Sequence, residues 1–469
     1  MRARLTLTGL LLLTCAPSLL AQTPPPAVPA APAYQVLRFD EDWSFLKDRS
    51  RRADFWDPLK YIPLNDRGWY ASLGAEVRER YEGYVHSGFG AGPQDPNGYL
   101  LQRYLGHADV HTGAHIRFFT QLQSGLAVGR VGGPRALGDK DQFEFHQAFA
   151  DIKIGTAPKK TAFVRFGRQE FEFGSGRLIS SGELLNVRRS FDGVRLSGQF
   201  GQWTFHSIAA RPVATNPGAL DDKADHAQKV WGAGVVHPNP RANGGYFSVY
   251  YIGFDRREGR FDSGVGREGR HTLGSRVFGT GANWDYNYEV IAQWGSFQNH
   301  PIRAWAISTD TGRSLVKAAF RPRFGIKADV GSGDQDAKDE TLQTFNPLFP
   351  NTAYSGKIGL LGPQNIVDVE PGVRLRPTPR ITATAEWGFF WRESLHDGIY
   401  GLSLSPFKTG QVSRSRYVAN QPDLQVSFAV DRHLTVVGIL TQFRTASFIK
   451  DTPPSRNIGY ATLYFTYKF

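Results

Sequence analysis

The sequence WDYNYEVIAQW at residues 284–294 alternates apolar and polar side chains over its whole length. In an extended strand, one face would carry the aromatic and aliphatic side chains from Trp284 to Trp294, and the other would carry Asp285, Asn287, Glu289 and Gln293. Residues 382–392, TATAEWGFFWR, repeat the pattern. Strands of about ten residues with aromatic side chains near their ends are typical of a membrane-spanning β-barrel. We therefore predict an all-β membrane protein.

A soluble β-sandwich is the alternative, because its strands also alternate. Sandwich strands are shorter, at about 5–6 residues. Connections here are short at 376–380 and 431–433, and long and polar at 255–270, 331–356 and 393–416. This contrast between two ends is typical of outer-membrane barrels. The last strand, which ends at Phe469, would be an aggregation-prone edge unless it closed onto the first. These patterns predict a single closed antiparallel barrel over residues 69–469.

The N-terminal residues predict export. Arg2 and Arg4 precede an apolar stretch, and Ala21 offers a small residue for cleavage, so residues 1–21 are expected to be a signal peptide. Lipidation at Cys15 is the rival interpretation, but Thr14 stands where a smaller residue is expected. Residues 22–68 are predicted to be a Pro/Ala-rich linker and a periplasmic segment. The expected location is the outer membrane.

The charge balance is positive, with 55 Lys and Arg against 43 Asp and Glu, a formal net charge of +12. The total alone suits nucleic acid, anionic lipid or an acidic polymer. For an exported barrel we expect membrane lipid and an anionic polysaccharide or oligosaccharide as partners, and no nucleic acid. Periplasmic partner proteins are left open.

Strand parity predicts which charged side chains face the interior. If apolar side chains meet lipid, the lumen receives many arginines interspersed with carboxylates such as Glu76 and Asp192, while Glu79 falls on the lipid face. These arginines suit either ion-pair ladders or the passage of an anion, and parity leaves both open. The inward set is Arg78, Arg80, Arg195, Arg323, Arg374 and Arg392, with Arg117, Arg165, Lys327 and Arg376 as a secondary set.

Other residue patterns are weaker indications of a functional site. The GVGREG stretch at 264–269 has no apolar strand before it and is predicted to be a flexible loop. His111 and His115 would lie too far apart on a strand to share a metal. The acidic run at 334–340 suggests a calcium-binding or gating loop, or more simply a solvated one. No catalytic set stands out. We expect no enzyme activity, no cofactor and no metal.

Short motifs follow one another in a fixed order along the chain. They are RFDEDWSFL at 38–46, LKYIPL at 59–64, GAEVRER at 74–80, GRQ at 167–169, GR at 176–177, Asn186 with RSFDGVR at 189–195, GSGD at 331–334, and TFNPLFP at 344–350 with Tyr354. Together they resemble the alginate export family.

The resemblance implies an outer-membrane barrel of about 18 strands that passes an anionic uronate polysaccharide through an arginine-rich constriction. It assigns Arg177, Arg189 and Arg195 to the constriction. Arg168 fits the motif but needs a bulge at Gly167 to turn inward. A general or phosphate-type anion porin is the alternative function, followed by an outer-membrane enzyme.

Overall fold

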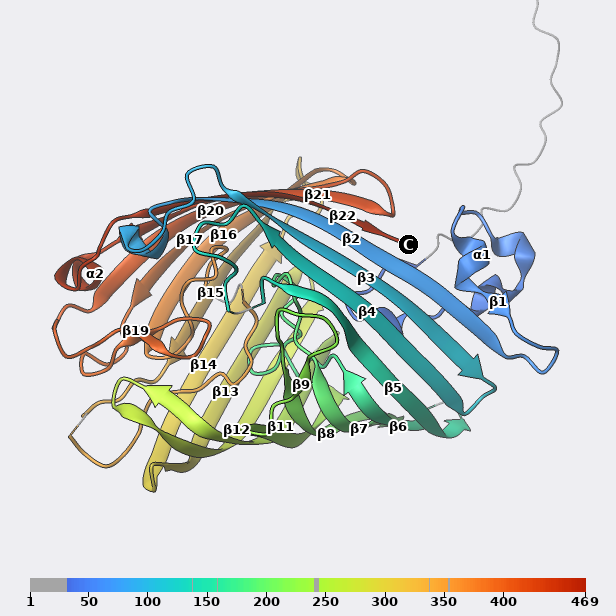
Figure 1. The fold of residues 1–469 in the computed structure, drawn as a ribbon, viewed down its shortest axis with the longest axis horizontal. Coiled ribbons are helices and arrows are strands. Elements are labelled where there is room, and N and C mark those ends of the chain that lie inside the picture. The colour runs from blue at the N-terminus through green and yellow to red at the C-terminus, as the bar shows by residue number, and fades with distance from the viewer. Residues whose placement is uncertain (1–31, 137, 158, 240–243, 337, 353–354) are drawn as a thin grey trace, which may run out of the picture. The chain divides into compact units, whose positions relative to one another are not determined.

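Eighteen antiparallel strands close into a barrel. Figure 1 shows how its wall curves round. In this computed structural model, residues 32–136, 138–157, 159–239, 244–336, 338–352 and 355–469 are described. The predicted signal peptide and Cys15 lie outside them. The strands of the wall are β2 Tyr70–Val85, β3 Tyr99–Thr112, β4 Ile116–Val128, β5 Asp141–Ala157, β6 Lys160–Gln169, β7 Phe191–Phe200, β8 Trp203–Ala214, β10 Gln228–Pro238, β11 Gly245–Phe261, β12 Gly264–Gly281, β13 Trp284–Phe297, β14 His300–Ser314, β15 Arg323–Gly331, β16 Ile366–Thr378, β17 Ile381–Trp391, β20 Tyr417–Ala429, β21 Leu434–Thr445 and β22 Ile458–Lys468.

Closure is made by the first and last of these strands. β2 pairs with β22 from Glu76 opposite Lys468 to Val85 opposite Gly459, and with β3 on its other edge. In Figure 1 the red β22 lies beside the blue β2. The prediction of a closed antiparallel barrel is therefore confirmed.

The strands have a lipid face and a lumen face, as the alternation predicts. Along β13, Trp284 and Trp294 are 46% and 44% exposed, whereas Glu289 and Gln293 on the other face are 2% and 3% exposed. Glu79 lies on the outer face, where the Tyr104 hydroxyl donates to its carboxylate at 2.7 Å. This bond partly satisfies a charge that would otherwise face lipid.

One sequence expectation is wrong. Residues 255–270 are not a long loop, because β11 and β12 run through them and leave only a tight turn between. Charged and Gly-rich residues continue as strand here since their charges pair inside the lumen: Glu268 accepts from Arg256 at 2.5 Å and from Arg270 at 2.6 Å. The stretch predicted to be a flexible loop at 264–269 is thus part of β12.

The two ends of the barrel differ. At one, the short-turn end, strands are joined by connections of a few residues such as 113–115 and 201–202. At the other, the long-loop end, connections include 170–190, 332–365 and 392–416. Loops 170–190 and 332–365 pair through an isolated bridge between Ile179 and Phe349 and form a buried apolar cluster with wall residues, so they fill part of the lumen. Short elements of this end are η4 Ser87–Gly90, β9 Lys223–Ala224, β18 Ile399–Tyr400, β19 Pro406–Lys408 and α2 Ser447–Asp451.

The segment before β2 packs against the C-terminal strand. Its elements are η1 Arg38–Asp40, η2 Ser44–Lys47, η3 Arg49–Arg51, α1 Asp57–Lys60 and β1 Ile62–Pro63. The Trp56 ring stacks on Phe469 with centroids 3.9 Å apart, and Arg38 Nη2 donates to the Phe469 carbonyl at 2.7 Å. Among the described residues, no helix is long and apolar enough to cross a membrane.

Candidate functional site

A row of charged side chains crosses four adjacent strands near the short-turn end. Arg117 of β4 lies opposite Asp151 of β5, Asp151 opposite Arg165 of β6, and Arg165 opposite Arg195 of β7. Asp151 accepts from Arg165 at 2.7 and 2.9 Å and lies 3.6 Å from Arg117, which also pairs with Asp109 at 2.7 Å. We call Arg117, Asp151, Arg165 and Arg195 the arginine row.

Arg195 is the unbalanced member of the arginine row. Its guanidinium makes no ion pair within 4.0 Å in the parts of the chain that the structure describes, and its Nε has no hydrogen-bond partner there. It lies over the rings of Phe163 and Phe171, at 5.7 and 5.4 Å. Like charges directly opposite each other on adjacent strands are unfavourable. The Arg165–Arg195 pair therefore leaves a positive field in the lumen.

Residues 34–43, which we call the inserted loop, reach this row from the short-turn end. Phe39 is buried edge-on against Phe119 and Phe149, and Arg117 Nη2 donates to the Phe39 carbonyl at 2.6 Å. The charged neighbours of Asp40 are, in order of effect, Arg195, Arg165, Arg117 and Asp151. Burial raises the pKa of the Asp40 carboxyl, against the opposing effect of these guanidiniums.

A second set of charges fixes loop 170–190 to the wall. Arg78 donates to the carbonyls of Glu183 at 2.9 Å and Leu185 at 2.6 Å, and Arg103 pairs with Glu183 at 2.7 Å. Arg188 pairs with both Glu170 and Glu183 at 2.5 Å. Burial alone would raise the pKa of Glu183, but Arg103 and Arg188 outweigh it and hold that pKa well below its usual value. The terminal guanidinium nitrogens of these arginines thus bind the loop.

A cavity of about 240 Å³ lies where loop 170–190 meets β2 and the loops 129–140, 332–365 and 392–416. Its charged lining is Arg80, Glu82, Arg135, Asp139, Arg189 and Lys357, four cations against two carboxylates. Arg189 Nη1 donates to the Pro350 carbonyl at 2.7 Å. Burial lowers the pKa of Arg189 to about 10, so the group stays protonated at neutral pH. Lys357 pairs with Glu386 at 3.0 Å behind the lining, so four cations stand against three carboxylates and the cavity keeps a surplus of one positive charge.

The remaining predicted residues are dispersed. Arg177 lies 3.2 Å from Glu289 and 3.6 Å from Asp329, Arg323 pairs with Asp285 and Asp310, and Lys327 lies 2.7 Å from Glu370. Arg374 and Arg376 are exposed on the short-turn half of β16. Arg392 is buried in loop 392–416, where it donates to carbonyls including that of Ser415 at 2.7 Å. The structure thus gathers Arg80 with Arg189, and Arg117 and Arg165 with Arg195, but not the whole set.

The bulge expected at Gly167 is absent from the strand pairing, because β6 stays in register with β5 and β7 from Phe166 to Arg168. Gly167 has a φ of +123°, and a Cβ there would lie 2.2 Å from the Ala148 carbonyl oxygen. After this irregularity Arg168 pairs with Asp192 at 2.8 Å and lies 3.8 Å from Glu144.

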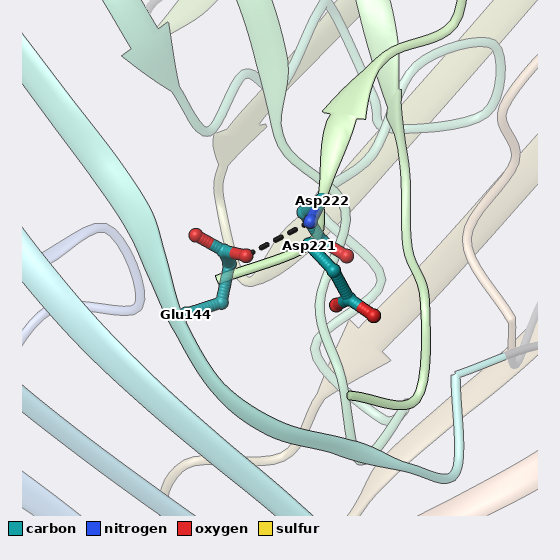
Figure 2. A group of neighbouring side chains, drawn as sticks. All are labelled: Glu144, Asp221 and Asp222. Atoms are coloured by element: carbon teal, nitrogen blue, oxygen red, sulfur yellow. Dashed lines mark hydrogen bonds between the residues drawn. The ribbon is translucent and has the colours of Figure 1, made fainter. Parts of the chain in front are cut away.

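Carboxylates of Glu144, Asp221 and Asp222 approach within 4.8 Å of one another, a spacing that could hold a metal ion. As Figure 2 shows, Glu144 Oε2 accepts from the backbone amide of Asp222, at 3.0 Å. Phe143 forms a parallel bridge with Ala219 beside it. These bonds fasten the connection after β8 to β5. Among the described residues, the acidic run at 334–340 forms no such group.

Sequence reasoning missed several members of these clusters. Arg103 could have been found, because parity in β3 places it on the same face as His107 and Asp109. Arg188 sits next to the motif at 189–195. Arg135 and Lys357 lie in loops, and Asp40 in the segment before the barrel, so no periodic signal marks them.

The comparisons with known proteins agree with this architecture. The sequence profile described as "Alginate export" matches residues 69–457. The chain belongs to the alginate export family. A comparison with curated protein sequences gave no match.

Solved structures of Pseudomonas aeruginosa channels share the fold of this alginate export family protein. OpdK with vanillate is 8% identical, with a TM-score of 0.60 over 85% of this chain and 98% of that one. OccK2 (OpdF) in complex with glucuronate is 10% identical, with a TM-score of 0.55 over 86% and 98%. OccD3 (OpdP) is 10% identical, with 0.57 over 88% and 93%. This alginate export family protein is an outer-membrane channel.

Proposed function

We propose that the barrel passes anionic sugars of the uronate type through its lumen. The observation that carries the proposal is the cationic surplus of the cavity between β2 and the loops at the long-loop end. Its four cations, Arg80, Arg135, Arg189 and Lys357, face the lining carboxylates Glu82 and Asp139 and the Lys357 partner Glu386. A surplus of positive charge in a confined channel attracts anions and repels cations. Guanidiniums also bind carboxylates bidentately, which favours uronates over neutral sugars.

The size of the cavity favours one ring at a time. Its 240 Å³ falls slightly below the roughly 300–1,000 Å³ of ordinary ligand pockets. A polymer would therefore pass in single file, and a monosaccharide or small carboxylate would fit alone. The glucuronate and vanillate named with two barrels of the same fold are carboxylates, which supports this substrate class.

Ion selectivity in planar bilayers tests the proposal. Under a tenfold KCl gradient, a channel of perfect anion selectivity would reverse at about 59 mV. We expect wild type on the anion side and block of its current by glucuronate and oligouronates. The triple variant R135Q/R189Q/K357Q leaves Arg80 against the carboxylates of Glu82, Asp139 and Glu386 and should shift the reversal potential toward cations.

Arg260→Gln is the matched control, because Arg260 is exposed and pairs only with the exposed Glu258. Assembly of each variant is checked by the heat-dependent shift of folded barrels on gels. A wild-type channel without anion preference would refute the proposal. Equal block by phosphate and by uronates would instead favour the general or phosphate-type anion porin.

A further inference from the structure

The inserted loop is held at both ends. The rings of Tyr34 and Trp43 lie 5.7 Å apart, so the loop begins and ends at the same place. The Tyr34 hydroxyl lies 3.3 Å from Nδ1 of His433, in the turn between β20 and β21. Between these ends the chain reaches into the barrel, where the Val36 carbonyl accepts from Arg188 at 3.2 Å.

The middle of the loop is also fixed. Arg38 donates to the carbonyls of Ala75 at 3.0 Å and Phe469 at 2.7 Å, and pairs with Glu41 at 2.7 Å. The next residue, Phe39, is buried between Phe119 and Phe149, with the Arg165 guanidinium 4.1 Å from its ring centroid. These contacts leave Asp40 little choice of position, so its carboxylate stays beside the arginine row.

Asp40 complements the charge of that row. Arg117 and Arg165 are already paired with Asp151, and Arg117 with Asp109 as well. Arg195 is the member of the arginine row that makes no ion pair within the described chain, and it is the charged group with the largest effect on Asp40. Yet Asp40 makes no direct ion pair within 4.0 Å among the described residues, and its surface stays accessible although the surrounding protein partly desolvates its carboxyl group. It therefore weakens the field of Arg195 without covering the guanidinium.

We infer that Asp40 is a tethered counter-ion that weakens the binding of transported anions at the arginine row, the anion-binding subsite of the channel. A transported carboxylate would bind Arg195 against the repulsion of Asp40, which keeps the subsite weak. This rests on the proposed anion pathway, since the ligand class is the same. Conduction needs sites that bind strongly enough to admit an ion and weakly enough to release it. Asp40 would supply the second condition.

The test compares block of single channels by glucuronate in wild type and Asp40→Asn. Asparagine keeps the shape of the side chain and removes its charge, so glucuronate should bind on the order of tenfold more tightly and stay bound longer. Asp42→Asn is the matched control, because Asp42 is exposed and its carboxylate accepts from the Ser44 amide instead of facing the row. It should behave as wild type.

A cysteine at position 40 gives a second test of the charge effect. The sequence has one cysteine, Cys15, in the predicted signal peptide, so Asp40→Cys should place a single thiol in the lumen. A negatively charged methanethiosulfonate reagent should return glucuronate block to the wild-type level, and a positively charged reagent should strengthen it further. Both effects are read on channels already assembled.

Two outcomes separate this inference from the proposed function. In the first, wild type prefers anions, but glucuronate blocks Asp40→Asn and both thiol-modified forms of Asp40→Cys as it blocks wild type. The inferred role of Asp40 is then wrong and the channel proposal stands. If wild type has no anion preference but Asp40→Asn still gains tight glucuronate block, the subsite stands and the channel proposal fails.

Discussion

Replacing Arg188 by methionine should release loop 170–190 from the barrel wall. Arg188 is fully buried and donates to both oxygens of Glu170 at 2.5 Å, while its third nitrogen pairs with Glu183 at 2.5 Å. Methionine fills similar space and removes all of these bonds. Glu183 keeps Arg103 at 2.7 Å, but Glu170 keeps only His146, at 2.8 Å, as a side-chain partner.

The expected loss of stability follows from the partners that remain, because Glu170 loses its arginine whereas Glu183 keeps Arg103. Breaking a buried ion pair by removing one partner costs about 3–5 kcal/mol, because the other charge stays buried and uncompensated. At about 1.4 kcal/mol for each factor of ten, the folded-to-unfolded ratio should fall by two to three orders of magnitude. Removing both charges in R188M/E170M should recover most of the loss, since a buried pair often exchanges for apolar residues at little cost.

Urea unfolding of the barrel in lipid vesicles measures these free energies, and protease cleavage within 170–190 reports release of the loop. Arg260→Gln is the control, because its exposed pair is worth at most about 1 kcal/mol. A loss below about 1 kcal/mol for R188M would refute the argument. So would a double variant as unstable as the sum of its single variants, because the two charges would then be independent.

Three further predictions use other parts of the chain. Gly167→Ala should destabilise the barrel by about 1–3 kcal/mol, because the new Cβ would clash with the Ala148 carbonyl and φ is left-handed. Gly68→Ala is the control, since φ there is +82° but no atom lies within 4 Å of the new Cβ, and it should lower the free energy of urea unfolding by less. Trp56→Ala removes the stacking on Phe469 and the bond to the Tyr467 hydroxyl, and should slow the appearance of heat-resistant barrels in refolding assays, whereas Phe55→Ala, an exposed neighbour, should not. Burial raises the pKa of Asp334 to about 7 and that of Asp397 to about 6. The folded loops therefore bind these protons more tightly than the unfolded chain, so the stabilisation is complete below the unfolded value of ~3.9 and is lost as the pH rises through 6 to 7. Protease cleavage of loops 332–365 and 392–416 should be slower at pH 5 than at pH 8, and Asp334→Asn should reduce the difference.

The sequence predicted the barrel and the two faces of its strands because both follow from a period of two residues. Trp284 and Trp294 alternate with Glu289 and Gln293 regardless of what the partner strands are. The same reasoning failed at 255–270, where glycine and charge suggested a loop. Composition cannot separate a polar loop from a polar lumen face, because the lumen accepts charges such as Arg256 and Glu268 when they pair across strands.

The contacts of the candidate site were beyond prediction for a different reason. Arg103 pairs with Glu183 eighty residues away, and Arg195 acts electrostatically on Asp40 across more than 150 residues of sequence. No sequence periodicity or motif relates residues at either of these separations. Loops that fold into a lumen are placed by their own packing, here through the apolar cluster of Phe171, Ile179 and Phe349, and only then do their charges find partners.

These partners divide the arginines into two groups that the sequence cannot tell apart. In the first group the guanidiniums donate hydrogen bonds to buried carbonyls and carboxylates and so hold loops in place, as in Arg78, Arg188 and Arg392. Arg195 has no such partner in the described chain and acts on the lumen through its field. Because cations of this second kind attract a passing anion most strongly, the selectivity of the channel should follow a few residues rather than the total of +12. One carboxylate held beside the arginine row, as Asp40 is, would then change anion binding more than several charges removed from the outer surface.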